Sequence, residues 1–329
     1  MATMTKAERL AIARRRLRLV LQSRTVATWR TLEQKISDAG PGPMRVDPHV
    51  LTTARNDLIE AGVIVKTMVG PSPWFHLSEA APLDVQAKLA EVQPIHAGLQ
   101  QQNFKIRMGQ TLEIAAYRAF LGQPLFTTFG AFLDLDQHGD ELAYRKEEPP
   151  STVSGRTSEG KLDFMLTTQD GVAGVELKNI REWLYPDRKE VRDFLRKCTD
   201  LNVLPVLIGR RLPYVTFKLL NTCGVVIHQT YNQLFPAADA ELAAKASAKE
   251  LLGYHDIRVG NQPDARLLKF VNDNLPSLIS KMRPAFDEYR DLLTDFANDE
   301  ISYAVFAARV RRRSQGTNEK NDWPDPEED

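Results

Sequence analysis

The stretch from Lys161 to Asn179 constrains the fold of this chain most strongly, because it has the pattern of two consecutive strands. Leu162, Phe164 and Leu166 alternate along its first half, as the side chains on one face of a strand do. Residues 169–171, Gln-Asp-Gly, supply a tight turn, in which glycine takes backbone angles that other residues avoid. The sequence therefore predicts a hairpin with an apolar core at this position.

Three charged residues interrupt this apolar hairpin: Asp163, Glu176 and Lys178. Glu176 and Lys178 are two residues apart, so on a strand they point to the same side. Two carboxylates and a lysine in a buried sheet cost free energy unless something binds them. A divalent metal offsets that cost, because carboxylate oxygens ligate Mg²⁺ or Mn²⁺ and a neighbouring lysine can hold or deprotonate a water. A surface hairpin whose charges lie this way by chance is the alternative.

The order Asp163, then Glu176-x-Lys178, resembles the PD-(D/E)xK nuclease superfamily, which includes many restriction enzymes and archaeal Holliday-junction resolvases. The resemblance implies that Asp163, Glu176 and the carbonyl of Leu177 hold the metal. It also implies that Lys178 orients or activates the attacking water. The proline that precedes the aspartate in this superfamily is missing here, and Leu162 takes its place.

The elements around the hairpin are predicted in an order similar to the αβββαβ core of that superfamily, with one further strand. The resemblance implies a mixed sheet flanked by helices, and it gives Glu113, on the helix before the sheet, as a further acidic residue at the metal. An ordinary exposed glutamate is the alternative. The predicted elements are a helix over 108–121, a strand over 125–132, the hairpin, a helix over 187–199 capped by Asp187, a strand over 203–209, a helix over 214–220, a strand over 224–228 and a helix over 231–235.

The first 80 residues are predicted to form three helices, over 6–22, 26–37 and 48–61, followed by two strands around a turn. Asp47 and Pro48 are suited to begin the third helix and Gly62 to end it. This layout resembles a winged helix-turn-helix domain. The resemblance implies that five residues of the third helix face outward toward DNA, unless the domain serves dimerisation or protein docking. These residues are His49, Thr52, Thr53, Arg55 and Asn56.

The formal net charge is zero but is unevenly spread. Residues 1–46 hold ten Lys or Arg against three acidic residues, whereas one lysine stands against six acidic residues from Thr317 onward. A basic N-terminal segment on a chain with no net charge favours a polyanionic partner. A solvated helix face would give the same excess of Lys and Arg. Further candidate DNA contacts are Arg30, Arg45, Arg156, Lys161, Lys189, Arg192 and Arg196.

The 329 residues are more than one ordinary core needs, so several domains are expected. No apolar run reaches transmembrane length, the N-terminus has no signal-peptide pattern, and the two cysteines make no disulfide framework, so we expect a cytoplasmic protein without membrane contact. The predicted segments are a winged helix-turn-helix domain over 1–80, a helical connector over 81–104, a nuclease domain over 105–236, a helical region over 237–313 and a disordered acidic tail over 314–329.

These patterns together predict a Mg²⁺- or Mn²⁺-dependent endonuclease that hydrolyses phosphodiester bonds of double-stranded DNA as a homodimer. The layout resembles Mrr-type modification-dependent restriction enzymes, although those commonly carry Gln where this chain has Glu176. Restriction, phage defence or mobile-element DNA processing is the expected context. The C-terminal helices have three alternative roles: they cap the catalytic domain, form a helical bundle in a dimer, or bind a partner protein. The alternative functions are a non-catalytic winged-helix DNA-binding regulator and a structural subunit of a defence complex.

Overall fold

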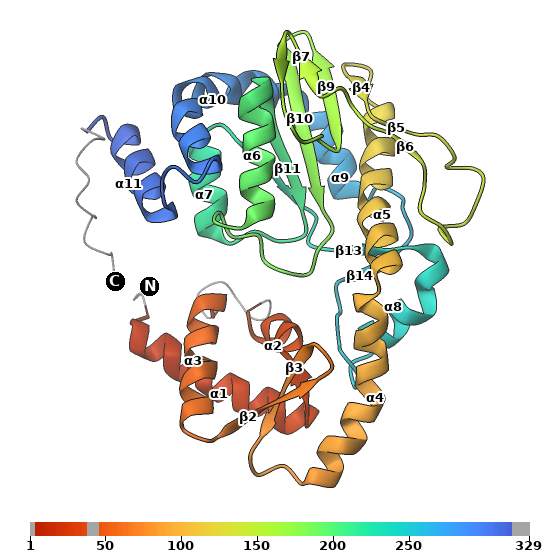
Figure 1. Ribbon diagram of the computed structural model, residues 1–329, viewed down its shortest axis with the longest axis vertical. Coiled ribbons are helices and arrows are strands. Elements are labelled where there is room, and N and C mark those ends of the chain that lie inside the picture. Colours follow the sequence, from red (N-terminus) through yellow and green to blue (C-terminus); the bar gives the residue numbers. More distant parts are fainter. Residues whose placement is uncertain (1–3, 38–45, 318–329) are drawn as a thin grey trace. The chain divides into compact units, whose positions relative to one another are not determined.

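The computed structural model describes residues 4–37 and 46–317, which form two compact units. The first unit contains the described residues up to Phe104 together with Ala240–Ile257, and the second contains the rest. The chain therefore passes from one unit to the other three times (Figure 1). Within the described ranges, every helix is too short or too polar to cross a lipid bilayer.

The N-terminal part of the first unit consists of three helices and a three-stranded antiparallel sheet with the strand order β1-β3-β2. The predicted succession of three helices and a hairpin is confirmed, and the short strand β1 adds to it. The elements are α1 (Lys6–Arg24), β1 (Ala27–Thr28), α2 (Trp29–Ile36), α3 (Pro48–Glu60), β2 (Ile64–Val69) and β3 (Ser72–Leu77).

Local capping sets the ends of these helices. The side chain of Thr5 accepts a hydrogen bond from the backbone of Glu8, whose carboxylate accepts one from the Thr5 backbone, so α1 begins with a capping box. The predicted helix over 26–37 begins late, at Trp29, because Thr28 pairs with β3 and caps α2 with its hydroxyl. Gly62, at a φ of 66°, follows the end of α3 as predicted.

The first unit is completed by two helices from distant parts of the chain, α4 (Pro82–Gln100) and α8 (Ala240–Ser247), which pack together. The segment after α8 packs in the same unit, where Tyr254 is fully buried. The guanidinium of Arg24 also donates a hydrogen bond of 2.5 Å to the carbonyl of Leu251. The predicted boundaries at 80 and 236 do not follow these two units, since the helical C-terminal region contributes to both.

The second unit is a mixed α/β structure around a five-stranded sheet with the order β12-β11-β10-β9-β4. The hairpin strands β9 and β10 are antiparallel and meet at Gly171, as predicted, while β10, β11 and β12 run parallel. The strands are β4 (Thr127–Phe129), β9 (Phe164–Thr168), β10 (Gly171–Lys178), β11 (Leu204–Gly209) and β12 (Val226–Gln229).

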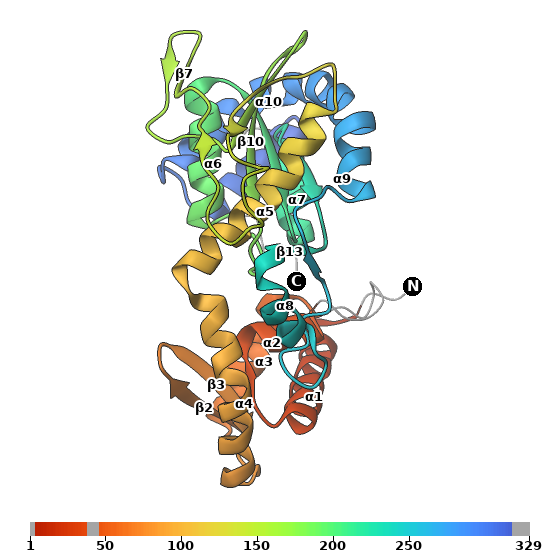
Figure 2. The same ribbon diagram turned by 90° about the vertical axis from the view of Figure 1, so that its right-hand side faces the viewer.

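Helices cover both faces of this sheet. In Figures 1 and 2, α6, α7 and α10 lie on one side of it, and α5 and α9 lie on the other. A π-helical turn, η3 (Phe270–Asn274), joins α9 to α10 without a break. The helices are α5 (Gln102–Leu121), α6 (Lys189–Leu201), α7 (Tyr214–Thr222), α9 (Ala265–Lys269), α10 (Leu275–Ala297) and α11 (Tyr303–Ser314), with a 3₁₀ turn η2 (Ala237–Asp239) before α8.

Three other predictions differ from the structure. The segment over 231–235 contains a strand, β13 (Gln233–Phe235), which pairs with β14 (Ile257–Val259), and not a helix. Asp187 does not cap α6, which begins after Arg188. The predicted strand over 125–132 is divided by Gly130, at a φ of 96°. Short strands in this region are β5 (Ala131–Phe132), β6 (Lys146–Glu147), β7 (Thr152–Val153) and β8 (Arg156–Thr157).

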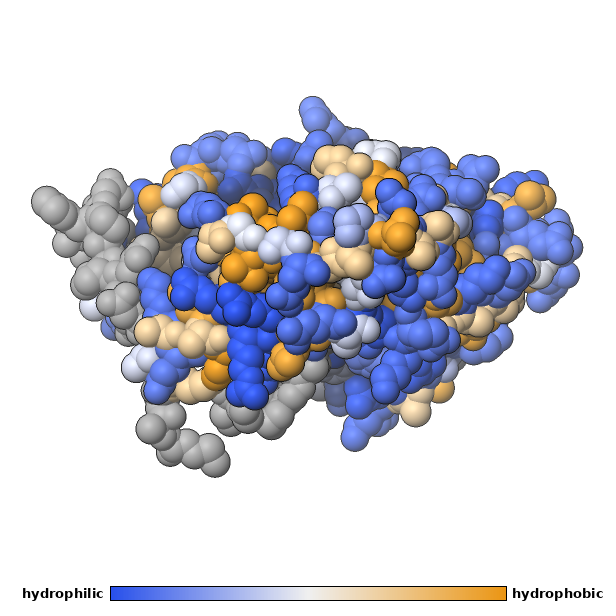
Figure 3. All heavy atoms as spheres, turned by 90° about the horizontal axis from the view of Figure 1, so that it is seen from below, coloured by the Kyte–Doolittle hydropathy of each residue, from blue (hydrophilic) through white to orange (hydrophobic). Residues whose placement is uncertain are grey.

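The surface of the described residues mixes polar and apolar side chains. On the face drawn in Figure 3, strongly hydrophilic residues interrupt the hydrophobic ones. On α1, for example, Arg15 and Arg18 are exposed beside Leu19, whose exposed fraction is 52%. The core of the second unit, by contrast, is one continuous cluster that the sheet shares with α5, α6 and α10.

Candidate active site

The antiparallel pairing of the hairpin brings Asp163 and Glu176 to the same place in the second unit. The backbone amide of Asp163 donates to the carbonyl of Val175 at 3.0 Å, and its carboxylate accepts a hydrogen bond of 2.6 Å from the amide of Leu177. Glu176 is buried, with an exposed fraction of 4%. The ammonium of Lys178 lies 2.7 Å from a carboxylate oxygen of Glu176, so the two side chains share one side of β10 as predicted.

Glu113 joins this group through a lysine that the sequence analysis did not single out, Lys146. Lys146 is held on β6, where it pairs with Phe132 of β5, and its ammonium lies 2.6 Å from the Glu113 carboxylate. The same ammonium is 3.8 Å from a carboxylate oxygen of Asp163 and lies over the ring of Phe164. Lys146 therefore bridges Glu113 of α5 and Asp163, and Glu113 is not an ordinary exposed glutamate.

A third lysine, Lys197 of α6, reaches the buried carboxylate of Glu176. Its ammonium lies 2.9 and 3.1 Å from the two carboxylate oxygens. The aliphatic part of Lys197 passes Gly160 so closely that an added Cβ would lie 3.2 Å from its Cε. Neither Lys146 nor Lys197 was assigned to the site, because only the packing of the loop and of α6 onto the hairpin shows which cations reach the carboxylates.

The surroundings shift the protonation of these groups strongly. Burial raises the pKa of Asp163 to about 8, helped by the negative charges of Glu176 and Glu113 and opposed by Lys146 and Lys178. Burial alone would lower the pKa of Lys178, but the charges of Glu176 and Asp163 outweigh it and raise this pKa above its ordinary value. The pKa of Lys146 is raised in the same way by Glu113 and Asp163. Both lysines are thus held as ammonium groups.

The donor atoms are of the kind that binds a hard divalent cation, although the carboxylates contact lysines. Three carboxylates and the nearby Leu177 carbonyl are the oxygen ligands that Mg²⁺ and Mn²⁺ prefer. In the described part of the chain, however, no group of three or more His, Cys, Asp or Glu side chains is arranged to hold a metal ion. Lys146 contacts two of these carboxylates, since its ammonium lies 2.6 Å from Glu113 and 3.8 Å from Asp163.

The candidate DNA contacts on α3 fall into two groups. His49, Thr53 and Asn56 are exposed and recur at helical spacing on one face. Thr52 is half-buried, and its hydroxyl, like that of Thr53, donates to a backbone carbonyl within α3. Arg55 is also half-buried. Its guanidinium lies 4.2 Å from the centre of the Trp29 ring, so it packs on an aromatic side chain inside the unit.

The other candidate cations are also divided. Arg156, Lys161 and Lys189 are exposed on the second unit. The guanidinium of Arg192 packs over the ring of Phe296 and pairs with Asp299. Arg196 is half-buried and pairs with Asp193, and Arg30 is half-buried. Arg45 lies outside the described residues.

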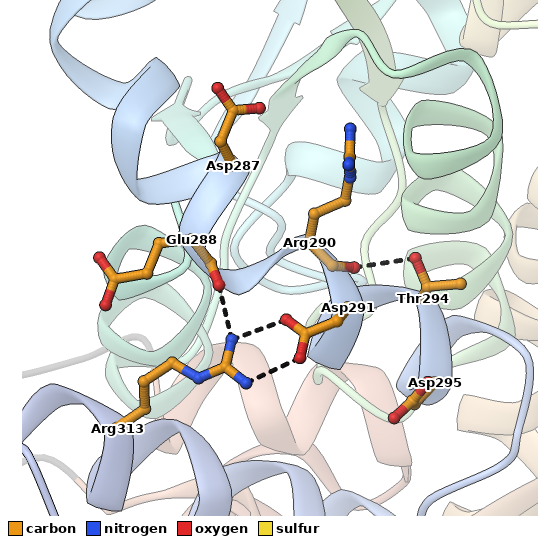
Figure 4. Close-up of a pocket in the computed structure, with 7 residues that line it drawn as sticks. All are labelled: Asp287, Glu288, Arg290, Asp291, Thr294, Asp295 and Arg313. Atoms are coloured by element: carbon orange, nitrogen blue, oxygen red, sulfur yellow. Dashed lines mark hydrogen bonds and ion pairs between the residues drawn. The ribbon is translucent and has the colours of Figure 1, made fainter.

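A cavity of about 610 Å³ lies on α10 and α11, away from the motif residues (Figure 4). Figure 4 shows the guanidinium of Arg313 clamped by the Asp291 carboxylate, at 2.6 and 2.8 Å, and by the Glu288 carbonyl. These contacts are the packing of α11 onto α10, and nothing at the cavity points to a ligand. The residues around it are Asp287, Glu288, Arg290, Asp291, Thr294, Asp295 and Arg313.

Comparison with known proteins adds nothing to this geometry. No protein-family model matches the chain, and searches of the curated proteins and of the solved structures found no match. The arrangement of the charged residues in the second unit is therefore the basis for any assignment of function.

Proposed function

We propose that this protein is a metal-dependent DNA endonuclease of the restriction-endonuclease-like fold. The observation that carries the proposal is the meeting of Asp163, Glu176 and Lys178 in the second unit, with Glu113 joined to them through Lys146. The order of elements supports it: a helix, a strand, an antiparallel hairpin, a helix and a parallel strand follow one another, as in the PD-(D/E)xK core.

The carboxylates of Asp163, Glu176 and Glu113, with the carbonyl of Leu177, would hold Mg²⁺ or Mn²⁺. When bound, the cation supplies positive charge that stabilises the phosphate in the transition state. Lys178 is an ammonium beside Glu176, so it is suited to hold the attacking water by donating a hydrogen bond. The backbone amide of Leu177 fixes the orientation of the Asp163 carboxylate.

Double-stranded DNA is the proposed substrate because the first unit has the layout of a winged helix-turn-helix domain. On α3, the exposed side chains of His49, Thr53 and Asn56 share a face that could enter a major groove. A homodimer, which would bring two active sites to a double-strand break, stays a prediction, as does a role in restriction, phage defence or mobile-element processing.

One observation favours a second candidate function, a non-catalytic DNA-binding regulator. Glu113 and Glu176 have close lysine partners, and Asp163 lies 3.8 Å from Lys146, so lysines already face the carboxylates without a metal. In that case the ion pairs would serve only to hold α5, the hairpin and α6 together.

The test is incubation of the purified protein with supercoiled, linear and methylated DNA in Mg²⁺, Mn²⁺ or EDTA. The proposal predicts cleavage that needs the metal and that is lost in Asp163→Asn and Lys178→Ala, while both variants still bind DNA. Asp170→Asn, which changes an exposed carboxylate in the turn of the same hairpin, serves as the control and should cleave normally. DNA binding without cleavage under every condition would favour the regulator.

A further inference from the structure

The five-stranded sheet of the second unit ends at β4, which pairs with β9 on one side. On the other side of β4, no strand of the described ranges pairs with it. An end strand of this kind presents unpaired backbone N–H and C=O groups, to which a further strand can hydrogen-bond. Natural proteins usually protect such an edge with charged side chains, especially lysine, or cover it with a helix or a loop.

The segment that carries β4 has no charged side chain. Residues 119–133 contain no Asp, Glu, Lys, Arg or His, although 26% of the chain is charged. Alternate residues of this segment are exposed: Leu125 by 60%, Phe129 by 42%, and Thr127 between them. The two residues that separate these three are half-buried. The outward face of β4 therefore combines large apolar side chains with an absence of charge, which is typical of the centre of a protein–protein interface.

The segment is complementary to a copy of itself. Two antiparallel copies related by a two-fold axis at Thr127 place Leu125 of each chain opposite Phe129 of the other, on the exposed face. Apolar pairs that include an aromatic ring and Thr–Thr pairs stabilise neighbouring strands, whereas like charges directly opposite each other destabilise them. Because the segment is uncharged, the two-fold axis brings no like charges together. This match favours a second copy over an unrelated strand.

We propose that β4 is a dimer interface, at which it pairs antiparallel with β4 of a second copy about Thr127 and continues the sheet through both chains. Leu121 and Leu133, near the two ends of the uncharged segment, are exposed by 63% and 55% and add apolar surface there. This pairing does not depend on the endonuclease activity proposed above, and it gives the predicted homodimer a defined interface.

The experiment measures the mass of the full chain by sedimentation equilibrium, in EDTA and without DNA, from nanomolar to high micromolar concentration. The wild-type chain should move from 37.1 kDa toward twice that mass as its concentration rises. Thr127→Lys sets two ammonium groups opposite each other at the axis, so it should weaken the dimer roughly a hundredfold. Thr127→Glu should do the same with two carboxylates. An equimolar mixture of the two variants should dimerise again, because each lysine then faces a glutamate.

Thr157→Lys changes an exposed threonine of β8 in the same unit, so it serves as the matched control and should dimerise like the wild-type chain. Below the concentration of dimerisation, all variants should melt at the temperature of the wild-type chain, because both threonines are exposed. A wild-type chain that stays at 37.1 kDa, a Thr127→Lys chain that dimerises as well as the wild type, or a mixture that stays monomeric would each overturn the proposal.

Cleavage assays of the same preparations keep this interface separate from the proposed function. Dimers that depend on Thr127 in a chain that never cleaves DNA would support the interface and contradict the endonuclease. Metal-dependent cleavage by a chain that stays monomeric would do the reverse.

Discussion

Six side chains around the candidate active site balance one another. The three carboxylates of Glu113, Asp163 and Glu176 face three lysines, of which Lys146 and Lys178 have raised pKa values and stay charged. With all three carboxylates ionised the group is formally neutral, and below a pH of about 8, the raised pKa of Asp163, protonation of that carboxylate leaves an excess of positive charge. A divalent cation that displaced one lysine would leave one positive charge in excess, and a phosphodiester is the natural partner for such an excess.

Lys146 is the lysine whose position conflicts most directly with a bound cation. We predict that Lys146→Gln binds Mn²⁺ roughly tenfold more tightly than the wild-type chain, a change of about 1.4 kcal/mol, because the competing ammonium is gone. The measurement is the rise in melting temperature with Mn²⁺ concentration. Lys161→Gln removes an exposed lysine that belongs to the same loop region and should leave the affinity unchanged. Equal or weaker binding by Lys146→Gln would show that the lysine supports the cation instead.

His228 on β12 makes stability depend on pH. Burial lowers its pKa to about 4 from an ordinary 6.5, with a smaller opposing effect of Asp264 and a smaller reinforcing effect of Arg266. The unfolded chain therefore binds more protons between these two values, so the free energy of unfolding falls as pH drops through this window. The slope from this group is at most about 1.4 kcal/mol per pH unit.

The comparison is with His228→Phe, which keeps a ring where His228 stacks on Phe270 at 4.3 Å. Urea unfolding from pH 7 to pH 4 should show a smaller loss of stability in the variant than in the wild-type chain. Parallel losses in the two chains would mean that His228 does not titrate with unfolding.

The turn between α7 and β12 depends on one glycine. Gly224 has a φ of 81°, and a Cβ there would lie 2.2 Å from the backbone nitrogen of Phe286 on α10. Gly224→Ala should destabilise the second unit by about 3 kcal/mol or more, because neither the backbone at Gly224 nor that at Phe286 can move without a large cost in free energy. Gly109→Ala, in the middle of α5 with open space around it, should instead stabilise by up to about 1 kcal/mol. Chemical denaturation measures the free energy of unfolding of both variants, and similar values for the two would contradict the prediction.

The sequence predicted the elements that carry a strong local signal. The helix α1, the end of α5 at Leu121, and the hairpin of β9 and β10 with its turn at Gly171 were located correctly, whereas α5 begins at Gln102, six residues before its predicted start at 108. The prediction of a helix over 231–235 was wrong, because a short apolar run fits a helix or a strand equally well. Only its pairing with β14 makes this segment a strand. The pairing of Lys178 with Glu176 follows from strand alternation, whereas the contact of Lys197 with Glu176 depends on how α6 packs and has no local signal.

The first unit is discontinuous, and the added segment is part of its core. Tyr254 is buried with its hydroxyl 3.4 Å from the Thr31 hydroxyl, and Gln34 donates a hydrogen bond to Asp256 at 3.0 Å. Gly253 approaches Arg24 so closely that a Cβ there would lie 2.7 Å from its guanidinium. A fragment that ends at residue 104 therefore lacks part of its own structure.

We predict that residues 1–104 alone are less stable than the same residues joined to 240–257 by a flexible Gly/Ser linker. The difference should reach about 3 kcal/mol, the usual cost of losing a large buried aromatic side chain. Thermal melting followed by circular dichroism compares the two, with the joined form carrying Tyr254→Ala as the control, which should lose most of the gain. Equal stability of all three would show that 240–257 is dispensable.

The same discontinuity sets an order of events during synthesis of the protein. Residues 105–239 leave the ribosome before Tyr254 does, so the strands β4 to β12 are available to fold while the first unit is still incomplete. At roughly 5–20 residues per second, the ribosome needs about 8–30 s to travel from residue 104 to residue 257. The second unit is completed later still, because α9, α10 and α11 belong to it and are made after residue 257. A nascent chain caught in that interval would hold two unfinished units, each waiting for a segment from further along the chain.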